Sequence, residues 1–384
     1  MARYFNSKKA YLRNAITKPK AVLSINLNLL LRMAMKFFII TVILGISGFS
    51  AVTAQDTIVK AKILDDGSQN AEKFYNSGIH YFQEKNFKAA LLEFDQAITL
   101  KADFDKAYYN RGNTRFELAD FKGSMEDYSM ALNISQQSEY FFGRAQVKVA
   151  TGDKMGALED YSSAIQMNTG YSQAFYYRGV IKFENEDYQG AITDFTEAIK
   201  FNNEYAYAFN DRGSAKLQIK DLDGAIFDYK KALAINPNMP FTLNNMASAK
   251  RKKADFKGAI EDYTSAIKLK GDYYVAYTNR GSAKIDAGDF KGAIDDFSKA
   301  LQLKADYAFA LNNRATAKYK LKDYQGSIDD CTKAIQIDAK YGYAYLNRGI
   351  AKEMLKDFTG ACSDWKNAIE LGIETAKNYS ADCK

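Results

Sequence analysis

Few residues in this chain have the types and spacing that chemistry requires. His80 is the only histidine, and no cysteine lies near it in the sequence, because Cys331, Cys362 and Cys383 are all close to the C-terminus. A metal site needs a cluster of ligands, and a hydrolytic triad needs a base that a neighbouring group orients. Neither arrangement is visible, and no glycine-rich loop for phosphates occurs. We therefore expect no catalytic residue, no metal site and no cofactor.

Carboxylates are numerous, but they recur with arginine and lysine in one fixed pattern. The aspartates are Asp127, Asp160, Asp194, Asp228, Asp262, Asp296, Asp330 and Asp364, the arginines are Arg111, Arg144, Arg178, Arg212, Arg280, Arg314 and Arg348, and the lysines are Lys148, Lys182, Lys216, Lys250, Lys284, Lys318 and Lys352. Groups that recur in one environment are more economically scaffold ion pairs than a catalytic or metal site. We expect exposed pairs of this kind to contribute less than about 1 kcal/mol each.

A small residue sets the period of the chain. It reads Gly78, Gly112, Ala145, Gly179, Gly213, Ala247, Gly281, Ala315 and Gly349, and only the step from Gly112 to Ala145 is one residue short of 34. Nine copies of one repeat therefore fill residues 71–375. Periodicity of this length is typical of a repeat array, in which each copy packs only on its neighbours.

The copy between Tyr274 and Tyr307 shows the internal plan of a repeat. One apolar stripe at helical spacing (Ala276, Tyr277, Gly281, Ala283) is broken at residues 286–289, and a second follows (Phe290, Ala293, Ile294, Phe297, Ala300, Leu301, Leu303). This pattern predicts a helix, a tight turn and an antiparallel helix. We expect the small residue of the first helix to face Ala293 and Ala300, with the aromatic between them filling the gap to the next repeat.

These features resemble the tetratricopeptide repeat family over residues 71–375. The match rests on the period, on the small residues of both helices and on the aromatic place of the second helix (Phe94, Tyr128, Tyr161, Phe195, Tyr229, Tyr263, Phe297, then Cys331 and Trp365). The resemblance implies an all-α fold, a right-handed superhelical solenoid of nine helix-turn-helix repeats, whose first helices line a concave groove that binds proteins or peptides. The expected repeats are 71–104, 105–137, 138–171, 172–205, 206–239, 240–273, 274–307, 308–341 and 342–375, followed by a C-terminal cap at 376–384.

Asparagine stands two places before the small residue in six repeats, as Asn76, Asn110, Asn245, Asn279, Asn313 and Asn347, and Asp211 takes this place in a seventh. An amide side chain can donate to a carbonyl and accept from an N–H at once. A row of amides along a groove would therefore hold an extended peptide by its backbone. Similar ladders line the repeat superhelix of O-linked N-acetylglucosamine transferases, although nothing here resembles their catalytic domain. The alternative is that these residues satisfy backbone groups inside the array.

One place earlier, the predicted groove changes character along the chain. Its residues are Tyr75, Tyr109, Phe142 and Tyr176, then Asn210, Asn244, Thr278 and Asn312. Aromatic anchors are favoured at interfaces, but stacking between neighbouring first helices explains the aromatic members equally well.

The sixth repeat departs most from the pattern. Met246 replaces its arginine, and a basic run covers residues 250–253. We expect Arg251 and Lys252 to face the groove, either as a patch for an acidic partner or as part of a solvated face.

The cysteines suggest how the C-terminal end is covered. Cys331 takes a core aromatic place and should be a buried thiol. A short helical tail from Glu374 should cover the apolar face of the last repeat. In an oxidising compartment, a disulfide between Cys362 and Cys383 would fasten this tail.

The N-terminal segment has the composition of an export signal. Residues 1–54 carry eight basic residues and no acidic one, so the remainder has 45 basic and 46 acidic residues, a balance that argues against nucleic-acid binding. The apolar run at 37–50, followed by Val52-Thr53-Ala54, predicts a signal peptide at 35–54, with a non-native extension at 1–34 and a linker at 55–70. An uncleaved anchor or an organelle transit peptide is the alternative. If the signal peptide is cleaved after Ala54, residues 55–384 would be periplasmic or extracellular in a Gram-negative bacterium, with no stable membrane span.

The sequence therefore predicts an exported, non-enzymatic scaffold that binds a protein or an extended peptide segment. The alternative is a cell-envelope adaptor that binds wall polymer or glycan through its tyrosine-rich half, or that supports a partner enzyme.

Overall fold

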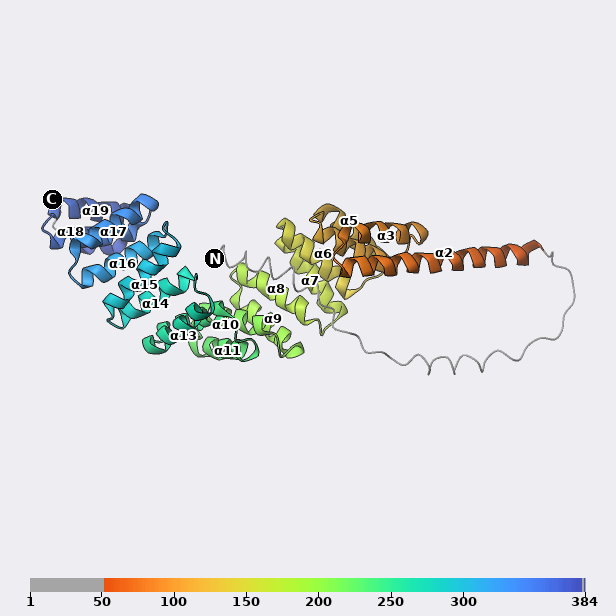
Figure 1. Ribbon diagram of the computed structural model, residues 1–384, viewed down its shortest axis with the longest axis horizontal. Coiled ribbons are helices and arrows are strands. Elements are labelled where there is room, and N and C mark those ends of the chain that lie inside the picture. Colours follow the sequence, from red (N-terminus) through yellow and green to blue (C-terminus); the bar gives the residue numbers. More distant parts are fainter. Residues whose placement is uncertain (1–51, 382, 384) are drawn as a thin grey trace. The chain divides into compact units, whose positions relative to one another are not determined.

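The computed structural model describes the backbone of residues 52–381 and of Cys383 (Figure 1). The predicted extension at 1–34 and most of the predicted signal peptide lie outside the described residues. The chain divides into two compact parts, an N-terminal part that ends at Thr169 and a C-terminal part that begins at Gly170. Every regular element in the described residues is helical, so each part is an all-α repeat array.

The N-terminal part contains three helix pairs. They are formed by α2 (Val52–Gln83) with α3 (Phe87–Leu100), α4 (Asp105–Glu117) with α5 (Phe121–Ile134), and α6 (Ser138–Thr151) with α7 (Lys154–Met167). Each first helix also contacts the second helix of the pair before it. This is the stacking expected of a solenoid, because each pair buries its apolar faces only against its neighbours.

The C-terminal part contains six further pairs and a short final turn. The pairs are α8 (Ser172–Glu184) with α9 (Tyr188–Phe201), α10 (Ala206–Gln218) with α11 (Leu222–Ile235), α12 (Pro240–Lys252) with α13 (Phe256–Leu269), α14 (Tyr274–Asp286) with α15 (Phe290–Leu303), α16 (Ala308–Lys320) with α17 (Tyr324–Ile337), and α18 (Gly342–Met354) with α19 (Phe358–Glu370). A 3₁₀ helix, η2 (Glu374–Asn378), follows α19 and packs against it.

In the six repeats where it is glycine, the small residue of the first helix is required by the aromatic residue of its own second helix. A Cβ atom added to Gly281 would lie 2.9 Å from Cε1 of Phe297. Ala293 and Ala300 flank Phe297 and are fully buried. The aromatic residue also reaches the next repeat, since Tyr263 packs with Ala283. The predicted packing is therefore extended: the aromatic fills space within its own repeat as well as toward the next one.

The turn within each repeat has a fixed construction. In the second to ninth repeats an aspartate caps the second helix and accepts a hydrogen bond from the glycine three residues later, as Asp255 does from Gly258 at 2.9 Å. In the first repeat Asn86 takes this place and accepts from Ala89. The residue before this cap has a positive φ in every repeat. It is glycine at Gly152 and Gly288, and otherwise Lys85, Ala119, Glu186, Lys220, Ala254, Lys322 and Lys356. Seven repeats therefore hold a side chain in a backbone conformation that favours glycine.

The prediction of a linker at 55–70 is wrong. These residues belong to α2, which begins at Val52 and continues into the first repeat. The segment contains no proline and only Gly67 as a glycine, so nothing in it ends a helix that the first repeat already nucleates.

Candidate binding surface

Successive first helices lie side by side and are joined by hydrogen bonds between residues 35 apart. The Nδ2 atom of Asn279 donates to Oδ1 of Asn244 at 3.0 Å, and Nδ2 of Asn347 donates to Oδ1 of Asn312 at 2.8 Å. In the N-terminal part, Asn110 donates to the hydroxyl of Tyr75 at 3.1 Å. The asparagine ladder is therefore partly structural, because its amide groups join each repeat to the one before.

Of the remaining ladder residues, Asn76 is exposed, and Asn245 and Asn313 make only long contacts. Asn313 donates to the Ser282 hydroxyl at 3.5 Å, and Asn245 accepts from its neighbour Asn244 at 3.5 Å. Asn245, Asn279, Asn313 and Asn347 are all half-buried. No hydrogen bond within the described residues uses Oδ1 of Asn279 or Asn347. These carbonyl oxygens can therefore accept from a ligand.

The second predicted groove row is mostly enclosed, which corrects its assignment as an accessible lining. Tyr176 is 2% exposed, Asn210 is 0% exposed, and Asn244 and Asn312 are also buried. Tyr75 and Tyr109 are half-buried, and their rings lie 4.9 Å from Phe104 and Tyr140, respectively. Neighbouring first helices approach closely enough to close over these side chains.

The enclosed row contains a buried chain of polar contacts. Thr242 donates to Oδ1 of Asn210 at 2.9 Å, Asn210 donates to Asp211 at 2.9 Å, and the Tyr176 hydroxyl donates to Asp211 at 2.8 Å. These bonds connect the fourth, fifth and sixth repeats. They satisfy polar groups that would otherwise be costly to bury.

A row that the sequence interpretation missed lies one helical turn before the asparagines. Its members, 34 residues apart, are Tyr207, Phe241, Val275, Phe309 and Tyr343. Phe309 is 43% exposed and Tyr343 is 55% exposed, and the rings of Tyr207 and Phe241 stack at 5.9 Å. The same period carries this signal, but it could not be separated from core packing without knowledge of burial. We call this row, together with Asn245, Asn279, Asn313 and Asn347, the Asn–aromatic surface.

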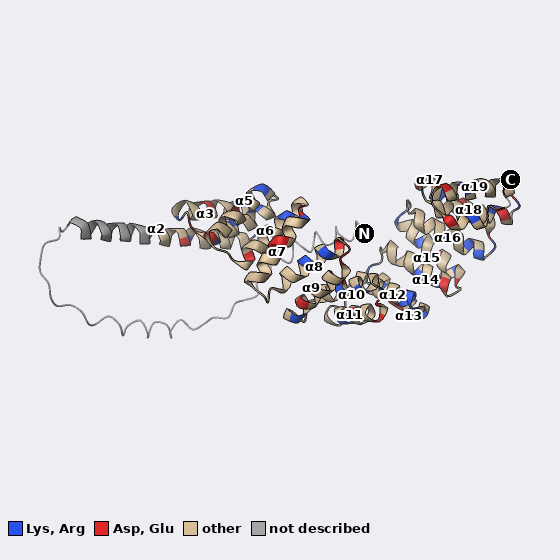
Figure 2. Cartoon of the chain, turned by 180° about the vertical axis from the view of Figure 1, so that it is seen from behind, with Lys and Arg blue, Asp and Glu red and all other residues tan. Residues whose placement is uncertain are grey.

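Arg251 does not form part of a free basic patch. It contacts Asp286 of the next repeat at 2.5 Å, Lys250 contacts Asp262 at 2.6 Å, and Lys253 pairs with Asp223. Figure 2 shows basic and acidic residues dispersed along both parts of the chain. The basic run of the sixth repeat is thus largely neutralised by the scaffold.

The recurring aspartate, arginine and lysine form a buried clamp, which corrects the expectation of exposed ion pairs. Arg280 donates to both oxygens of Asp296, at 2.6 and 2.9 Å, and Lys284 contacts Asp296 at 2.9 Å. The Asp296 side chain is 5% exposed. Pairs equivalent to Arg280–Asp296 are Arg111–Asp127, Arg144–Asp160, Arg178–Asp194, Arg212–Asp228, Arg314–Asp330 and Arg348–Asp364. Breaking such a buried pair costs far more than breaking an exposed one.

The sixth repeat lacks the arginine of this clamp. Asp262 keeps only Lys250 as a cationic partner. Burial raises the pKa of Asp262, and the Lys250 ammonium only partly opposes this effect.

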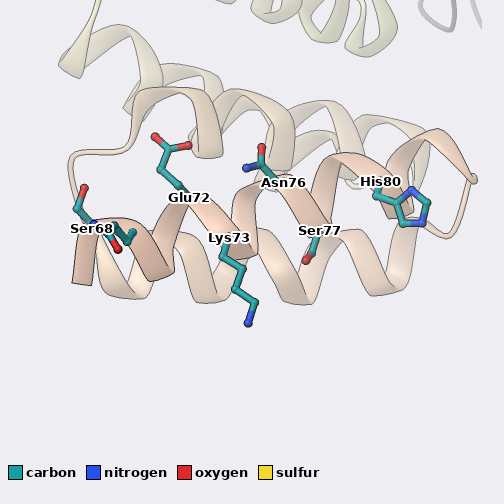
Figure 3. Close-up of a pocket in the computed structure, with 7 residues that line it drawn as sticks. Ser68, Glu72, Lys73, Asn76, Ser77 and His80 are labelled. Atoms are coloured by element: carbon teal, nitrogen blue, oxygen red, sulfur yellow. The ribbon is translucent and has the colours of Figure 1, made fainter. Parts of the chain in front are cut away.

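His80 lies in a shallow depression on α2 with no convergent chemistry. The lining side chains all come from this one helix, and in Figure 3 Glu72 and Asn76 point one way while Lys73 and Ser77 point the other. The imidazole of His80 lies 3.4 Å from the Glu84 carboxylate. No group of three or more His, Cys, Asp or Glu side chains able to hold a metal ion occurs in the described part of the chain.

The cap and the cysteines meet at the C-terminal end. A disulfide joins Cys362 of α19 to Cys383, and Ala376 of η2 is fully buried beneath it with Ile373 packed alongside. Cys331 is a buried free thiol, and burial raises its pKa to about 12. Within residues 52–381 and Cys383, no helix combines the length and the apolar character that crossing a membrane requires.

The helix pairs, the 34-residue period and the small-residue contacts define an all-α repeat protein of the helix-turn-helix class. The tetratricopeptide repeat family model matches residues 142–206, 181–240, 244–308 and 278–342, which together cover just over half of the chain. The chain belongs to the tetratricopeptide repeat family.

Solved structures agree with this fold. The C-terminal part of a repeat-containing protein from Cytophaga hutchinsonii is 17% identical, with a TM-score of 0.52 over 62% of this chain and 98% of that one. The Cut9–Hcn1 hetero-tetramer of the APC/C is 15% identical, with a TM-score of 0.51 over 69% of this chain and 52% of that one. MamA is 28% identical and covers 43% of this chain and 96% of its own, with a TM-score of 0.39. A comparison with curated proteins found no match.

Proposed function

We propose that this protein is an interaction scaffold that binds an extended peptide segment of another protein on the Asn–aromatic surface. The observation that carries the proposal is the pairing of two rows on the same first helices. No hydrogen bond in the described residues uses the carbonyl oxygens of Asn279 and Asn347. The half-exposed ring of Tyr343 lies one helical turn before Asn347 on α18, and that of Phe309 lies one turn before Asn313 on α16.

The two rows suggest how a peptide would be held. The asparagine amide groups are used to join the first helices, so the ladder offers mainly hydrogen-bond acceptors, which suit backbone N–H groups of a peptide. The aromatic rings offer apolar contact area, which is favoured at protein interfaces. Backbone recognition tolerates many sequences, while the aromatic row selects for apolar side chains.

An array of extended peptides, probed with the full chain, tests this proposal. Phe309→Ala and Tyr343→Ala should each weaken binding at least ten-fold to the peptides that the unmodified chain retains. Phe358→Ala is the matched control, because Phe358 is equally exposed but lies at the turn of the last repeat. Loss of binding in the control, or no loss in the two variants, would contradict the proposal.

Asn313→Ala tests the ladder with the least damage to the scaffold. Asn279 holds Asn244 at 3.0 Å, whereas the contact of Asn313 with Ser282 is 3.5 Å long. Asn313→Ala should therefore weaken peptide binding without lowering the unfolding temperature, and Asn279→Ala should lower both.

The glycan alternative receives no support from the tyrosines on which it rested, because Tyr176 is buried and Tyr75 and Tyr109 pack against neighbouring rings.

We further propose that the protein acts outside the cytoplasm. The Cys362–Cys383 disulfide supports this location, since such bonds persist in oxidising compartments. Cell fractionation with antibody detection tests it, and recovery of the protein in the cytoplasm alone would contradict it.

A further inference from the structure

The clamp arginines also join neighbouring repeats through one place on the preceding second helix. The Nη1 atom of Arg280 donates to Thr264, 16 residues earlier, at 3.0 Å. Equivalent bonds link Arg111 to Asp95, Arg212 to Thr196, Arg314 to Ser298 and Arg348 to Thr332, at 2.7–3.2 Å. Every one of these partners offers an oxygen as acceptor.

Lys230 occupies this place in the fifth repeat and cannot accept a hydrogen bond. The residue 16 places later is Met246, where most other repeats have the clamp arginine. An arginine at this place would put two cations in contact. Met246 is buried and packs with Tyr229 instead. The last repeat has a lysine at the same place, Lys366, where no described repeat follows. The clamp arginine is therefore absent at the one junction where the preceding second helix has a lysine in place of an acceptor.

The same helix carries one further departure, Phe227, and an exposed lysine, Lys231, whose place is also lysine in the seventh and eighth repeats (Lys299 and Lys333). Phe227 is 55% exposed at a place where five other repeats have an exposed carboxylate, namely Glu126, Glu159, Glu261, Asp295 and Asp329. Lys231 is exposed, and its ammonium lies 5.5 Å from the centre of the Phe227 ring. Phe227, Lys230 and Lys231 are three and four residues apart, so they share one face of α11.

No ion pair in the described residues involves Lys230 or Lys231. Asp223, one turn before Phe227, is the nearest carboxylate on this face of α11, and it is paired with Lys253 of the next repeat. The face therefore combines one exposed aromatic ring with two unneutralised cations, whereas five other repeats have a carboxylate at the place of Phe227 and only the last repeat shares the lysine of residue 230.

We infer that this face of α11 is a docking site for an acidic segment of a partner protein that also presents an apolar side chain. Carboxylates would pair with Lys230 and Lys231, and the apolar side chain would cover Phe227. The site lies on a second helix and is distinct from the Asn–aromatic surface on the first helices. It explains why the lysine and the exposed ring occur together on one helix, and the missing arginine at residue 246 follows from the lysine.

The observations favour a protein segment over an anionic membrane. A membrane would meet the neighbouring second helix as well as α11, and that helix carries Glu261 at the place of Phe227. Three side chains on one helix match the footprint of a short peptide, whereas membrane binding usually needs a larger cluster of cations.

Selection from a library of displayed random peptides on the immobilised full chain tests this inference. Three variants restore residues that other repeats have at the same places, so that folding is preserved: Phe227→Glu, Lys230→Thr and Lys231→Ser. Leu92→Glu is the matched control, because Leu92 occupies the place of Phe227 in the first repeat, where Asp95 replaces the lysine.

We expect peptides that combine several carboxylates with an aromatic or aliphatic residue to be enriched. Each of the three variants should weaken their binding at least ten-fold, higher salt should weaken it further, and Leu92→Glu should leave it unchanged. The inference is overturned if no peptide distinguishes the full chain from these variants, or if Phe309→Ala alone removes binding. It is also overturned if phosphatidylserine vesicles, and not acidic peptides, bind in a Phe227-dependent way.

Discussion

Arg280 bonds to Asp296 within its own repeat and to Thr264 in the repeat before it, with hydrogen bonds of 2.6 and 3.0 Å. One side chain therefore holds a helix pair together and joins it to its neighbour. Because the clamp recurs, the stability of the array depends on a series of similar junctions, each of which can be tested separately.

Asp296→Ala should lower the free energy of unfolding by about 3 kcal/mol, because it leaves Arg280 and Lys284 without their buried partner. Asp295→Ala is the control, since Asp295 is adjacent but exposed, and we expect less than about 0.5 kcal/mol. Urea unfolding followed by circular dichroism measures both. Equal effects would show that the clamp is no stronger than an exposed ion pair.

At the turn residues with positive φ, substitution by glycine should raise stability, and substitution of a glycine should lower it. Ala254 has a φ of 62°, so Ala254→Gly should relieve strain and raise stability by about 0.5–1 kcal/mol. Gly288 occupies the same place with a φ of 85°, and Gly288→Ala should lower stability by a similar amount. Thermal unfolding of the two variants is the measurement, and shifts of the same sign would contradict the explanation.

Lys230 and Met246 should behave as a coupled pair. Met246→Arg alone should destabilise the protein, because the new guanidinium would face Lys230. When Met246→Arg is combined with Lys230→Thr, the new guanidinium should pair with Asp262 and donate a hydrogen bond to the new threonine hydroxyl. A double-mutant cycle should therefore give a favourable coupling of about 1–3 kcal/mol. Additive effects would show that the two places do not interact.

The same double variant should change the dependence of stability on pH. In the unmodified chain the pKa of Asp262 is raised by burial, so its ionisation in the folded state costs stability that is recovered as the pH falls. An arginine at 246 would lower that pKa and add stability only while Asp262 is charged. The stability advantage of Lys230→Thr/Met246→Arg should thus be largest near pH 7 and shrink toward pH 4. Urea midpoints across this range are the measurement, and a constant difference would exclude Asp262 as the cause.

The C-terminal cap gives a prediction about the cysteines. Cys383→Ser should lower the stability of the last repeat by about 3 kcal/mol, because it opens a covalent loop between residues 21 apart. Mass spectrometry of the protein isolated without reducing agent should find one disulfide and one thiol. The thiol, Cys331, should react slowly with alkylating reagents until the protein unfolds, since it is buried and its pKa is raised to about 12. Three free thiols would contradict this prediction.

Most of the fold could be predicted because helix pairs depend on local spacing. The small residue, the break at residues 286–289 and the two apolar stripes all lie within one repeat, where sequence distance and spatial distance agree. Residues 55–70 are predicted as a linker but are helical, because their lack of proline lets α2 continue into the first repeat.

The binding surface was only partly predictable, since burial depends on how closely successive first helices approach. Asn210 and Asn312 are predicted to line the groove, but they are enclosed between helices. Phe309 and Tyr343 are not singled out by the sequence pattern, and they are exposed. No pattern within one repeat distinguishes these cases, because contacts between residues 35 apart decide them.

The exchange of Arg for Met at residue 246 also constrains how such a gene can be rearranged. Unequal recombination between similar repeats can delete or duplicate one copy and leave most junctions intact, because at five junctions the arginine donates to an oxygen acceptor of the preceding repeat. A crossover that separates Lys230 from Met246 instead places a lysine against an arginine. The fifth and sixth repeats should therefore be inherited as one block, even where the rest of the array grows or shrinks.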